Sequence, residues 1–288
     1  MPARPTANSA RPWRPKLGVC SWSLRPATPE ELAASVAGLP IDAVQLDLTP
    51  LIGGAWDEDR TFRLLEESGI EITSGMLAFE HEDYGSLDSI RRTGGLTPDE
   101  HWPRCEAELQ AAATIAERRG LGLVTTHAGH LPEAIGRTEV DSVMVDRLHT
   151  AAAIFAERGV RLGLETGQES AGTLEAYLDA VPDAAVNFDP ANMILYGMGD
   201  PHNALERLAP RVVQIHIKDA VPAPEPGIWG AEVVVGTGAV DWSRLLETAA
   251  RACPRAPLMI EREAGEERAE DIAAGASLVT EAIEGASR

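Results

Sequence analysis

The chain is poor in cysteine, in basic residues and in long apolar runs, and each shortage excludes a class of protein. Three cysteines among 288 residues, at Cys20, Cys105 and Cys253, are an odd number without paired spacing. They predict no disulfide framework or zinc motif and fit a reducing compartment. Because Lys and Arg number 25 against 45 Asp and Glu, for a formal net charge of −20, nucleic acids and acidic membrane surfaces are unfavourable partners. No apolar run approaches the ~20 residues that cross a bilayer.

The opening sequence, MPARPTANSARPWRPK, is basic and rich in proline, and no apolar segment follows it. It therefore lacks the features of a secretory signal, and the cytoplasm is the expected location. We expect residues 1–15 to form a flexible N-terminal arm. Residues 16–288 are expected to form one folded catalytic domain, since 44% hydrophobic and 24% charged residues are typical of a soluble globular chain.

Short apolar runs alternate along the chain with longer segments that have helical spacing. Eight of these runs are candidate strands: Leu17–Trp22, Ala43–Leu48, Glu71–Phe79, Leu121–Ala128, Val160–Thr166, Ala184–Asp189, Val212–Lys218 and Pro257–Glu263. Eight β/α units in one chain of this length predict a single-domain (β/α)8 TIM barrel with its site at the carboxyl ends of the strands. The alternative is a doubly wound open sheet, but no G-x-G-x-x-G follows the first strand.

Local signals mark helix starts and two long loops. Thr28 before Pro29, and Thr97 before Pro98, predict helix N-termini, and Asp241 predicts another cap. Long loops are expected after the third strand, at 80–96, and after the seventh, at 220–237. We expect the acidic residues at 80–83 to be a solvated surface.

Four consecutive candidate strands carry an ionisable residue near their carboxyl ends: Glu165, Asp189, His216 and Glu261. Any one of them alone would more often be a helix cap, an ion-pair partner or a core histidine. In a closed barrel, however, the four side chains converge, and three carboxylates in a semi-buried cavity need a compensating cation. An O,O,O,N donor set suits one divalent ion, with Mn²⁺ the first choice and Mg²⁺, Co²⁺ or Zn²⁺ as alternatives.

The segments LETG, FDPAN, HIKDA, GTGAVDW and IEREAG resemble the sugar phosphate isomerase/epimerase superfamily, the xylose-isomerase-like barrels. The resemblance extends from about residue 16 onward. It implies a (β/α)8 barrel with metal ligands Glu165, Asp189, His216 and Glu261. It also implies that Glu165 and Glu261 are the acid/base pair, which moves a proton beside a carbonyl through a metal-stabilised enediolate, while Asp189 and His216 mainly hold the ion.

Two positions depart from the ketose epimerases of that superfamily. Asn192 stands where they carry a second histidine, and Lys218 and Asp219 follow His216 where they place an arginine. Both positions contact substrate in those enzymes, so the departures weigh against a free-ketose 3-epimerase while leaving the metal site intact. Asn192 and Lys218 stay candidates for contact with substrate, and Lys218 is alternatively expected to pair with Glu165 or Glu261.

Further candidates lie at the ends of other strands. His127, at the end of the fourth, is expected to contact substrate hydroxyls or act as a second acid/base, or else to orient a neighbouring carboxylate. Trp22 is a candidate for stacking on a sugar face, although a core position is equally compatible with its sequence. Gln45, within the second strand, is a further candidate for the pocket wall.

The sequence thus predicts a metal-dependent isomerase or epimerase acting on a small carbohydrate or its keto derivative. A metal-dependent lyase or dehydratase, of the inosose dehydratase or 3-keto-glycoside-cleaving kind, shares the first step and is the alternative. A non-catalytic carbohydrate-binding barrel is a third possibility, against which the Glu165/Glu261 pair argues. A multi-zinc DNA-repair nuclease is rejected because the chain has 7 His and a strong negative charge. The resemblance also makes a homodimer or homotetramer reasonable.

Overall fold

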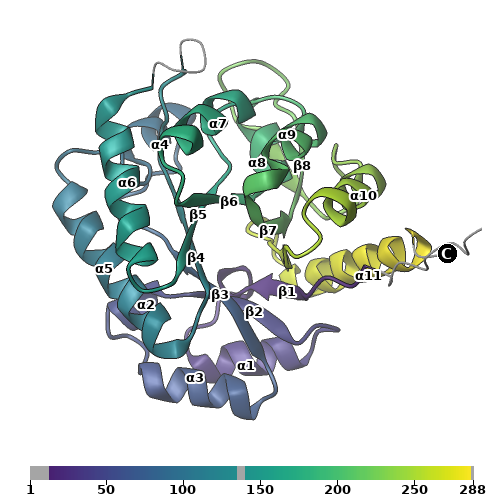
Figure 1. Ribbon diagram of the computed structural model, residues 1–288. Coiled ribbons are helices and arrows are strands. Elements are labelled where there is room, and N and C mark those ends of the chain that lie inside the picture. Colours follow the sequence, from purple (N-terminus) through teal and green to yellow (C-terminus); the bar gives the residue numbers. More distant parts are fainter. Residues whose placement is uncertain (1–12, 135–139, 287–288) are drawn as a thin grey trace, which may run out of the picture.

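The computed structural model describes residues 13–134 and 140–286, which form a closed barrel of parallel strands. The strands lie at the centre and helices surround them (Figure 1). Around the barrel the order is β1-β10-β7-β6-β5-β4-β3-β2, and each neighbouring pair is parallel. The strand bounds are β1 Leu17–Cys20, β2 Ala43–Asp47, β3 Glu71–Leu77, β4 Leu123–His127, β5 Arg161–Glu165, β6 Ala184–Phe188, β7 Val212–Ile217 and β10 Leu258–Ile260. The prediction of a barrel is confirmed, and the open sheet is excluded.

Helices connect the strands on the outside of the barrel. The larger ones are α1 Pro29–Ala37, α3 Glu58–Glu67, α5 Trp102–Arg119, α6 Ser142–Ala156, α7 Ala171–Ala180, α9 Pro201–Leu208, α10 Trp242–Ala252 and α11 Arg268–Ala286. Four short helices follow the carboxyl ends of strands: η1 Ser21–Leu24, α2 Thr49–Ile52, α4 Leu87–Thr93 and α8 Pro190–Leu195. A fifth, η2 Ala209–Arg211, lies between α9 and β7. A two-stranded antiparallel hairpin, β8 Asp219–Val221 and β9 Ala231–Val233, follows β7.

The core forms where apolar helix faces pack on the outer face of the barrel. Phe155 of α6, Leu109 of α5 and Leu245 of α10 are completely buried, as is Phe188 at the end of β6. Burying such a side chain contributes about 1.5–3 kcal/mol. Every residue of β6 is buried, as expected for a strand enclosed on both sides.

All eight predicted strands are present, but one of the three helix starts is wrong. Thr28 accepts a hydrogen bond from the Glu31 amide and Asp241 accepts one from the Arg244 amide, so both caps are confirmed. Thr97 does not begin a helix, because α5 starts only at Trp102. Its hydroxyl accepts instead from the amide of His130 at 2.8 Å, which ties this segment to the loop after β4.

The loop after β7 is organised around the carboxylate of Asp219. Its Oδ2 accepts from the amides of Gly236 (2.9 Å) and Gly238 (3.1 Å) and from the indole N–H of Trp242 (3.1 Å). Its Oδ1 accepts from the Val240 amide at 3.2 Å. A Cβ at position 238 would lie 2.1 Å from Oδ1, so only glycine fits there. Asp219 thus joins the HIKDA and GTGAVDW segments in the folded chain.

Of the predicted N-terminal arm, residues 1–12 lie outside the described residues. The indole N–H of Trp13 donates to the carbonyl of Pro254 at 3.1 Å, and Trp13 packs against the core. The single catalytic domain from residue 16 onward stays a prediction.

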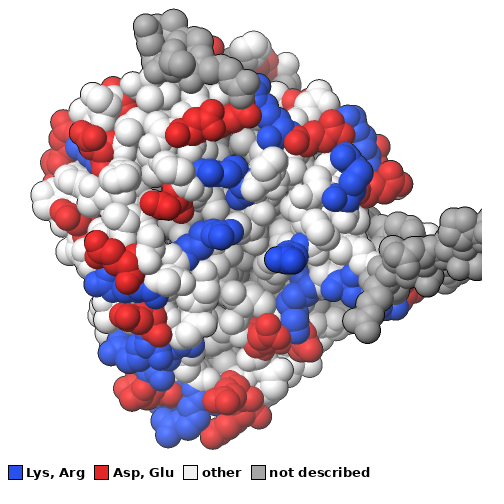
Figure 2. Space-filling model, in the orientation of Figure 1, with Lys and Arg blue, Asp and Glu red and all other residues white. Residues whose placement is uncertain are grey.

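On the face shown in Figure 2, acidic and basic side chains lie beside one another over much of the surface. Surface ion pairs of the protein include Arg104–Glu80 and Arg207–Glu175. Exposed pairs of this kind contribute about 0–1 kcal/mol each, so the fold depends on the core rather than on surface charge.

Candidate metal centre and active site

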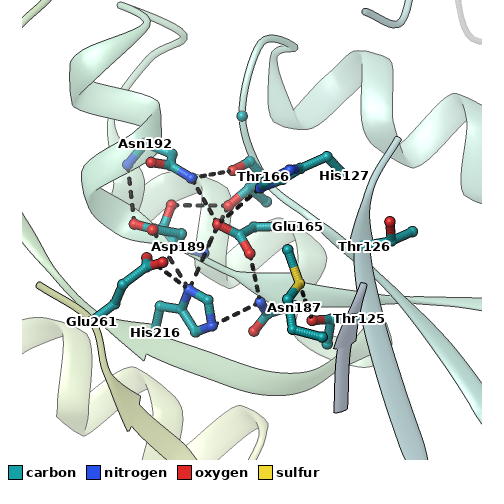
Figure 3. A network of polar contacts seen from close by, with 12 residues as sticks. Thr125, Thr126, His127, Glu165, Thr166, Asn187, Asp189, Asn192, His216 and Glu261 are labelled. Atoms are coloured by element: carbon teal, nitrogen blue, oxygen red, sulfur yellow. Dashed lines mark hydrogen bonds and ion pairs between the residues drawn. The ribbon is translucent and has the colours of Figure 1, made fainter. Parts of the chain in front are cut away.

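The four residues from the ends of β5, β6, β7 and β10 meet at one point. Glu165, Asp189, His216 and Glu261 each offer one donor atom, and these atoms lie within 4.8 Å of one another (Figure 3). The Nδ1 atom of His216 is 3.1 Å from Glu261 Oε2, 3.6 Å from Glu165 Oε1 and 3.7 Å from Asp189 Oδ2. All four side chains are buried. The convergence expected from the barrel topology is therefore present.

Asp189 shows why this cluster fits a cation. Its Oδ1 accepts from the amides of Ala191 (2.7 Å) and Asn192 (3.0 Å) and so caps α8. Its Oδ2 is buried and has no hydrogen-bond partner among the described residues. A buried carboxylate oxygen without a partner is costly, and a divalent ion among the four donors would satisfy it. The buried acidic and histidine cluster could therefore bind a metal.

Burial and the charges of neighbouring side chains shift the pKa values of all four cluster residues. Burial raises the pKa of Asp189 to about 6, against the opposing attraction of Lys218. For His216, burial favours the neutral form, but the carboxylates around it outweigh burial and raise its pKa well above the usual value. The pKa values of Glu165 and Glu261 are lowered despite burial because cationic neighbours face both carboxylates. Both glutamates are thus ionised near neutral pH.

Glu261 is held by two donors from other elements. The indole N–H of Trp22, on η1, donates to Oε1 at 2.7 Å, and the ammonium of Lys218 lies 3.0 Å from Oε2. Lys218 also pairs with Glu263 at 2.6 Å and lies 3.8 Å from Asp189. Its burial lowers the pKa, but these carboxylates outweigh that effect and keep it cationic. Trp22 and Lys218 both line the cavity at the carboxyl ends of the strands, and their contact with substrate stays a prediction.

Glu165 is held by two amides and lies near His127. Asn192 Nδ2 donates to Glu165 Oε1 at 3.0 Å, and Asn187 Nδ2 donates to Oε2 at 3.1 Å. The Nε2 atom of His127 lies 3.8 Å from Oε1. Asn192, expected only as a substrate contact, therefore also orients a predicted metal ligand.

Glu82 corrects the expectation that residues 80–83 are a solvated surface. Its carboxylate is 3% exposed and lies 3.2 Å from His127 Nδ1. It also accepts from the amides of Phe79 (3.1 Å) and Gly95 (2.9 Å). Burial alone would raise its pKa, but His127 and these amides lower it. For His127, Glu82 and Glu165 outweigh burial and raise the pKa well above its usual value. The carboxylate is thus part of the site.

Two residues of the cluster, Glu165 and Glu261, line a cavity of about 540 Å³ at the carboxyl ends of the strands. Aromatic side chains contribute to its wall: Trp22, Phe79, Tyr84, Tyr196 and Trp229. Glu169, on the loop after β5, also lines it, and burial raises the pKa of this carboxyl to about 7. Gln45 is not among the cavity residues. It lies in the barrel interior, where its Oε1 is 2.8 Å from His216 Nε2.

Sequence reasoning missed Glu82, Glu169 and Asn187. Glu82 and Glu169 lie in loops, where no periodicity distinguishes a buried carboxylate from an exposed one. Asn187 had a usable signal, since a polar residue inside a strand that is otherwise apolar, two residues before Asp189, should point into the barrel.

A closed parallel barrel with a polar cluster at the strand ends has the architecture of an enzyme. The profile of the Xylose isomerase-like TIM barrel family matches residues 33–282, so the chain belongs to this family. Its described residues contain no helix long and apolar enough to cross a membrane.

Several known proteins are similar to this chain. A xylose isomerase domain protein from Planctomyces limnophilus is 31% identical, with a TM-score of 0.84, and the match covers 95% of this chain and 99% of that one. Among curated proteins, 3-oxo-isoapionate decarboxylase of Pectobacterium atrosepticum is 33% identical over 100 residues, which are 33% of this chain and 36% of the decarboxylase. The match thus spans about a third of that relative's length.

Two more distant structures share the fold. A xylose isomerase-like barrel protein from Mycobacterium smegmatis, in complex with magnesium, is 15% identical with a TM-score of 0.66 over 90% of this chain and 89% of that one. L-Ribulose 3-epimerase is 14% identical with a TM-score of 0.68 over 95% and 96% of the two chains. Two of these similar proteins, the decarboxylase and the epimerase, are enzymes by their names.

Proposed function

We propose that the protein is a metal-dependent isomerase or epimerase that moves a proton on the carbon beside the carbonyl of a small carbohydrate. The observation that carries the proposal is the pair Glu165 and Glu261. These ionised carboxylates come from β5 and from the end of β10, on either side of β6 and β7, and both face the same His216 nitrogen. A carboxylate on each side of one substrate carbon can remove a proton from one face and return it to the other.

The residues of the site have two kinds of role, metal binding and the positioning of the two glutamates. Glu165, Asp189, His216 and Glu261 would hold a divalent ion, which stabilises negative charge on substrate oxygens when bound. The Trp22 indole and the Lys218 ammonium keep Glu261 ionised and fix its position. The amides of Asn187 and Asn192 do the same for Glu165. Each carboxylate is thus prepared to accept a proton.

The charges of the cavity favour an uncharged substrate. Seven carboxylates line it: Asp47, Glu82, Glu165, Glu169, Glu232, Glu261 and Glu263. Lys218 and His127 are the basic residues among the described lining residues. Glu261 and Glu263 already pair with Lys218, and Glu82 and Glu165 lie beside His127. A phosphate would meet no unpaired guanidinium there, whereas hydroxyl groups can donate to carboxylates and sugar faces can stack on aromatic walls. We therefore favour a free sugar, a polyol derivative or a keto-glycoside.

A lyase of the same family is the second candidate. It is supported by Asn192 and Lys218, which differ from the epimerase pattern, and by the partial match to a decarboxylase. Proton removal by a glutamate would then be followed by loss of a group from the neighbouring carbon. A change of product mass separates this outcome from isomerisation.

The test is solvent exchange at carbon. Purified protein with Mn²⁺ is incubated in D2O with a panel of free ketoses and 3-keto glycosides, and products are analysed by mass spectrometry and NMR. We expect deuterium beside the carbonyl with the wild type and with Glu270→Gln, an exposed control on α11. Glu261→Gln should exchange at least about 100-fold more slowly, because it lacks the base. Exchange at the wild-type rate in Glu261→Gln would refute the assigned role.

A further inference from the structure

A second cavity, of about 750 Å³, lies beside the cavity that contains Glu165 and Glu261. Its walls come from α4, from the loops after β4, β5 and α8, and from the first turn of α7. Its lining includes Leu87, Arg91, His130, Leu131, Thr173 and Met198. Three other residues line both cavities: Gln168, Glu169 and Tyr196. The two cavities therefore adjoin, and a ligand that extends past these three side chains would reach from one into the other.

The two cavities together exceed what one sugar ring needs. Each of them alone lies in the range of about 300–1,000 Å³ that is typical of sites for small organic ligands. The proton transfer proposed above takes place on a single ring, which would lie in the first cavity beside Glu165 and Glu261. The second cavity is thus left for a further part of the substrate.

The second cavity holds a guanidinium that has no acidic partner. The Nε atom of Arg91 donates to Nε2 of His130 at 3.2 Å. Burial and the charge of Arg91 lower the pKa of His130, so this imidazole is neutral and accepts the bond near neutral pH. Asp88 pairs with Arg92 instead, and no carboxylate among the described residues forms an ion pair with Arg91. The terminal N–H groups of Arg91 can therefore donate to a ligand.

Hydrogen-bond acceptors and apolar surface complete the second cavity. Glu169, at the junction of the two cavities, is 6% exposed, and its carboxylate accepts from the amide of Gly167 at 3.4 Å, which is long for such a bond. Gln168 adds an amide, and Leu131 and Tyr196 add apolar surface. A second sugar ring matches these groups, because its hydroxyls both donate and accept and its C–H faces pack on apolar side chains.

We propose that the second cavity is a subsite for the second sugar residue of a glycoside whose keto-sugar ring lies beside Glu165 and Glu261. The inference rests on the function proposed above and selects the keto-glycoside among the substrate classes favoured there. Arg91 donates to a hydroxyl of the second ring, while Gln168 and Glu169 contact the linkage between the rings. Binding of the second ring then holds the first ring in place for proton transfer.

The test compares probes that have one ring with probes that have two. The one-ring probes are methyl α- and β-glucosides oxidised to the ketone at C3. The two-ring probes are α- and β-linked glucose disaccharides oxidised at C3 of the non-reducing ring. Saturation-transfer NMR, on protein with Mg²⁺, shows which ring contacts the protein and gives dissociation constants by titration. Deuterium exchange in D2O gives kcat/KM for the same probes.

Two neighbouring arginines of α4 supply the variants. Arg91→Ala removes the guanidinium that lines the second cavity. Arg92→Ala, the matched control, removes a guanidinium that pairs with Asp88 and lines neither cavity. Both arginines are exposed, so neither substitution should disturb the core.

We expect saturation transfer to both rings of the preferred disaccharide. Its dissociation constant should be at least about tenfold lower than those of the one-ring probes, which corresponds to about 1.4 kcal/mol. Arg91→Ala should weaken binding of the disaccharide at least about fivefold more than binding of the one-ring probes, because it removes a charge-assisted hydrogen bond to the second ring. Arg92→Ala should change either affinity less than about twofold, since it breaks only an exposed ion pair.

Two results would overturn the inference. One is a disaccharide that receives saturation only on its keto ring and is neither bound nor turned over better than the one-ring probes. The other is an Arg91→Ala variant that binds every probe as Arg92→Ala does. Failure of the proposed function looks different. In that case no probe exchanges deuterium, while saturation still reaches the second ring and Arg91→Ala still weakens binding of the disaccharide, which would support the subsite alone.

Discussion

Asp189 offers the sharpest test of the claim that the site is built for a cation. Replacing it by Asn keeps an oxygen to cap α8 and removes the negative charge that the cluster does not neutralise. Without metal, Asp189→Asn should therefore be more stable than the wild type near neutral pH. With Mn²⁺, the order should reverse, because the variant lacks a ligand.

The magnitude follows from the pKa of Asp189, which burial raises from 3.8 to about 6. A carboxyl whose pKa is raised by folding destabilises the folded state above that pKa, and the penalty disappears as the pH falls below the unfolded value. The difference corresponds to about 3 kcal/mol in the free energy of unfolding, an upper value because the neighbouring groups titrate together. The stabilisation by Asp189→Asn should thus be largest above pH 6 and should shrink steadily toward pH 4.

The assay is urea denaturation in EDTA from pH 5 to pH 8, repeated at pH 7.5 with saturating Mn²⁺. Asp200→Asn, which alters an exposed cap on α9, is the control for loss of a surface carboxylate. A variant less stable than the wild type at pH 8 without metal, or a difference that does not change with pH, would refute the reasoning. So would equal stabilisation of both proteins by Mn²⁺.

Two further predictions concern residues around the site. Glu82→Gln should lower the pKa of His127, because its carboxylate raises that pKa. Titration of the His127 signals by NMR would show this, and an unchanged pKa beside an unchanged Glu80→Gln control would contradict it. Gly238→Ala should destabilise the fold by about 1–3 kcal/mol, since its Cβ would overlap the Asp219 carboxylate. Gly122→Ala, where a Cβ meets nothing within 4 Å, should change the denaturation midpoint little, and equal midpoints for both variants would argue against the role of Asp219.

The barrel could be predicted because its strands are short apolar runs at regular intervals, and the four-residue cluster could be predicted because topology forces neighbouring strand ends together. Glu165, Asp189, His216 and Glu261 each follow an apolar stem, so their convergence needs no knowledge of loops. Their roles as ligands and catalysts stay predictions.

What the sequence could not supply depends on contacts between distant segments. Glu82 lies in an acidic run that looks solvated, and only folding of the loop onto His127 buries it. Thr97 precedes a proline and two acidic residues, as a helix cap often does. Its hydroxyl, however, accepts a hydrogen bond from the amide of His130, and α5 begins only at Trp102. Gln45 was placed on the pocket wall, whereas the inward pleat of β2 points it into the barrel beneath His216.

The central claim is that Glu165, Asp189, His216 and Glu261 together hold one divalent ion. The most direct measurement is metal content by mass spectrometry, on protein purified without a metal-binding tag and then equilibrated with Mn²⁺, beside the Glu165→Ala/Asp189→Ala double variant. The account predicts about one ion per chain in the wild type and almost none in the double variant. A wild type that retains no ion, or a double variant that retains as much as the wild type, would contradict it.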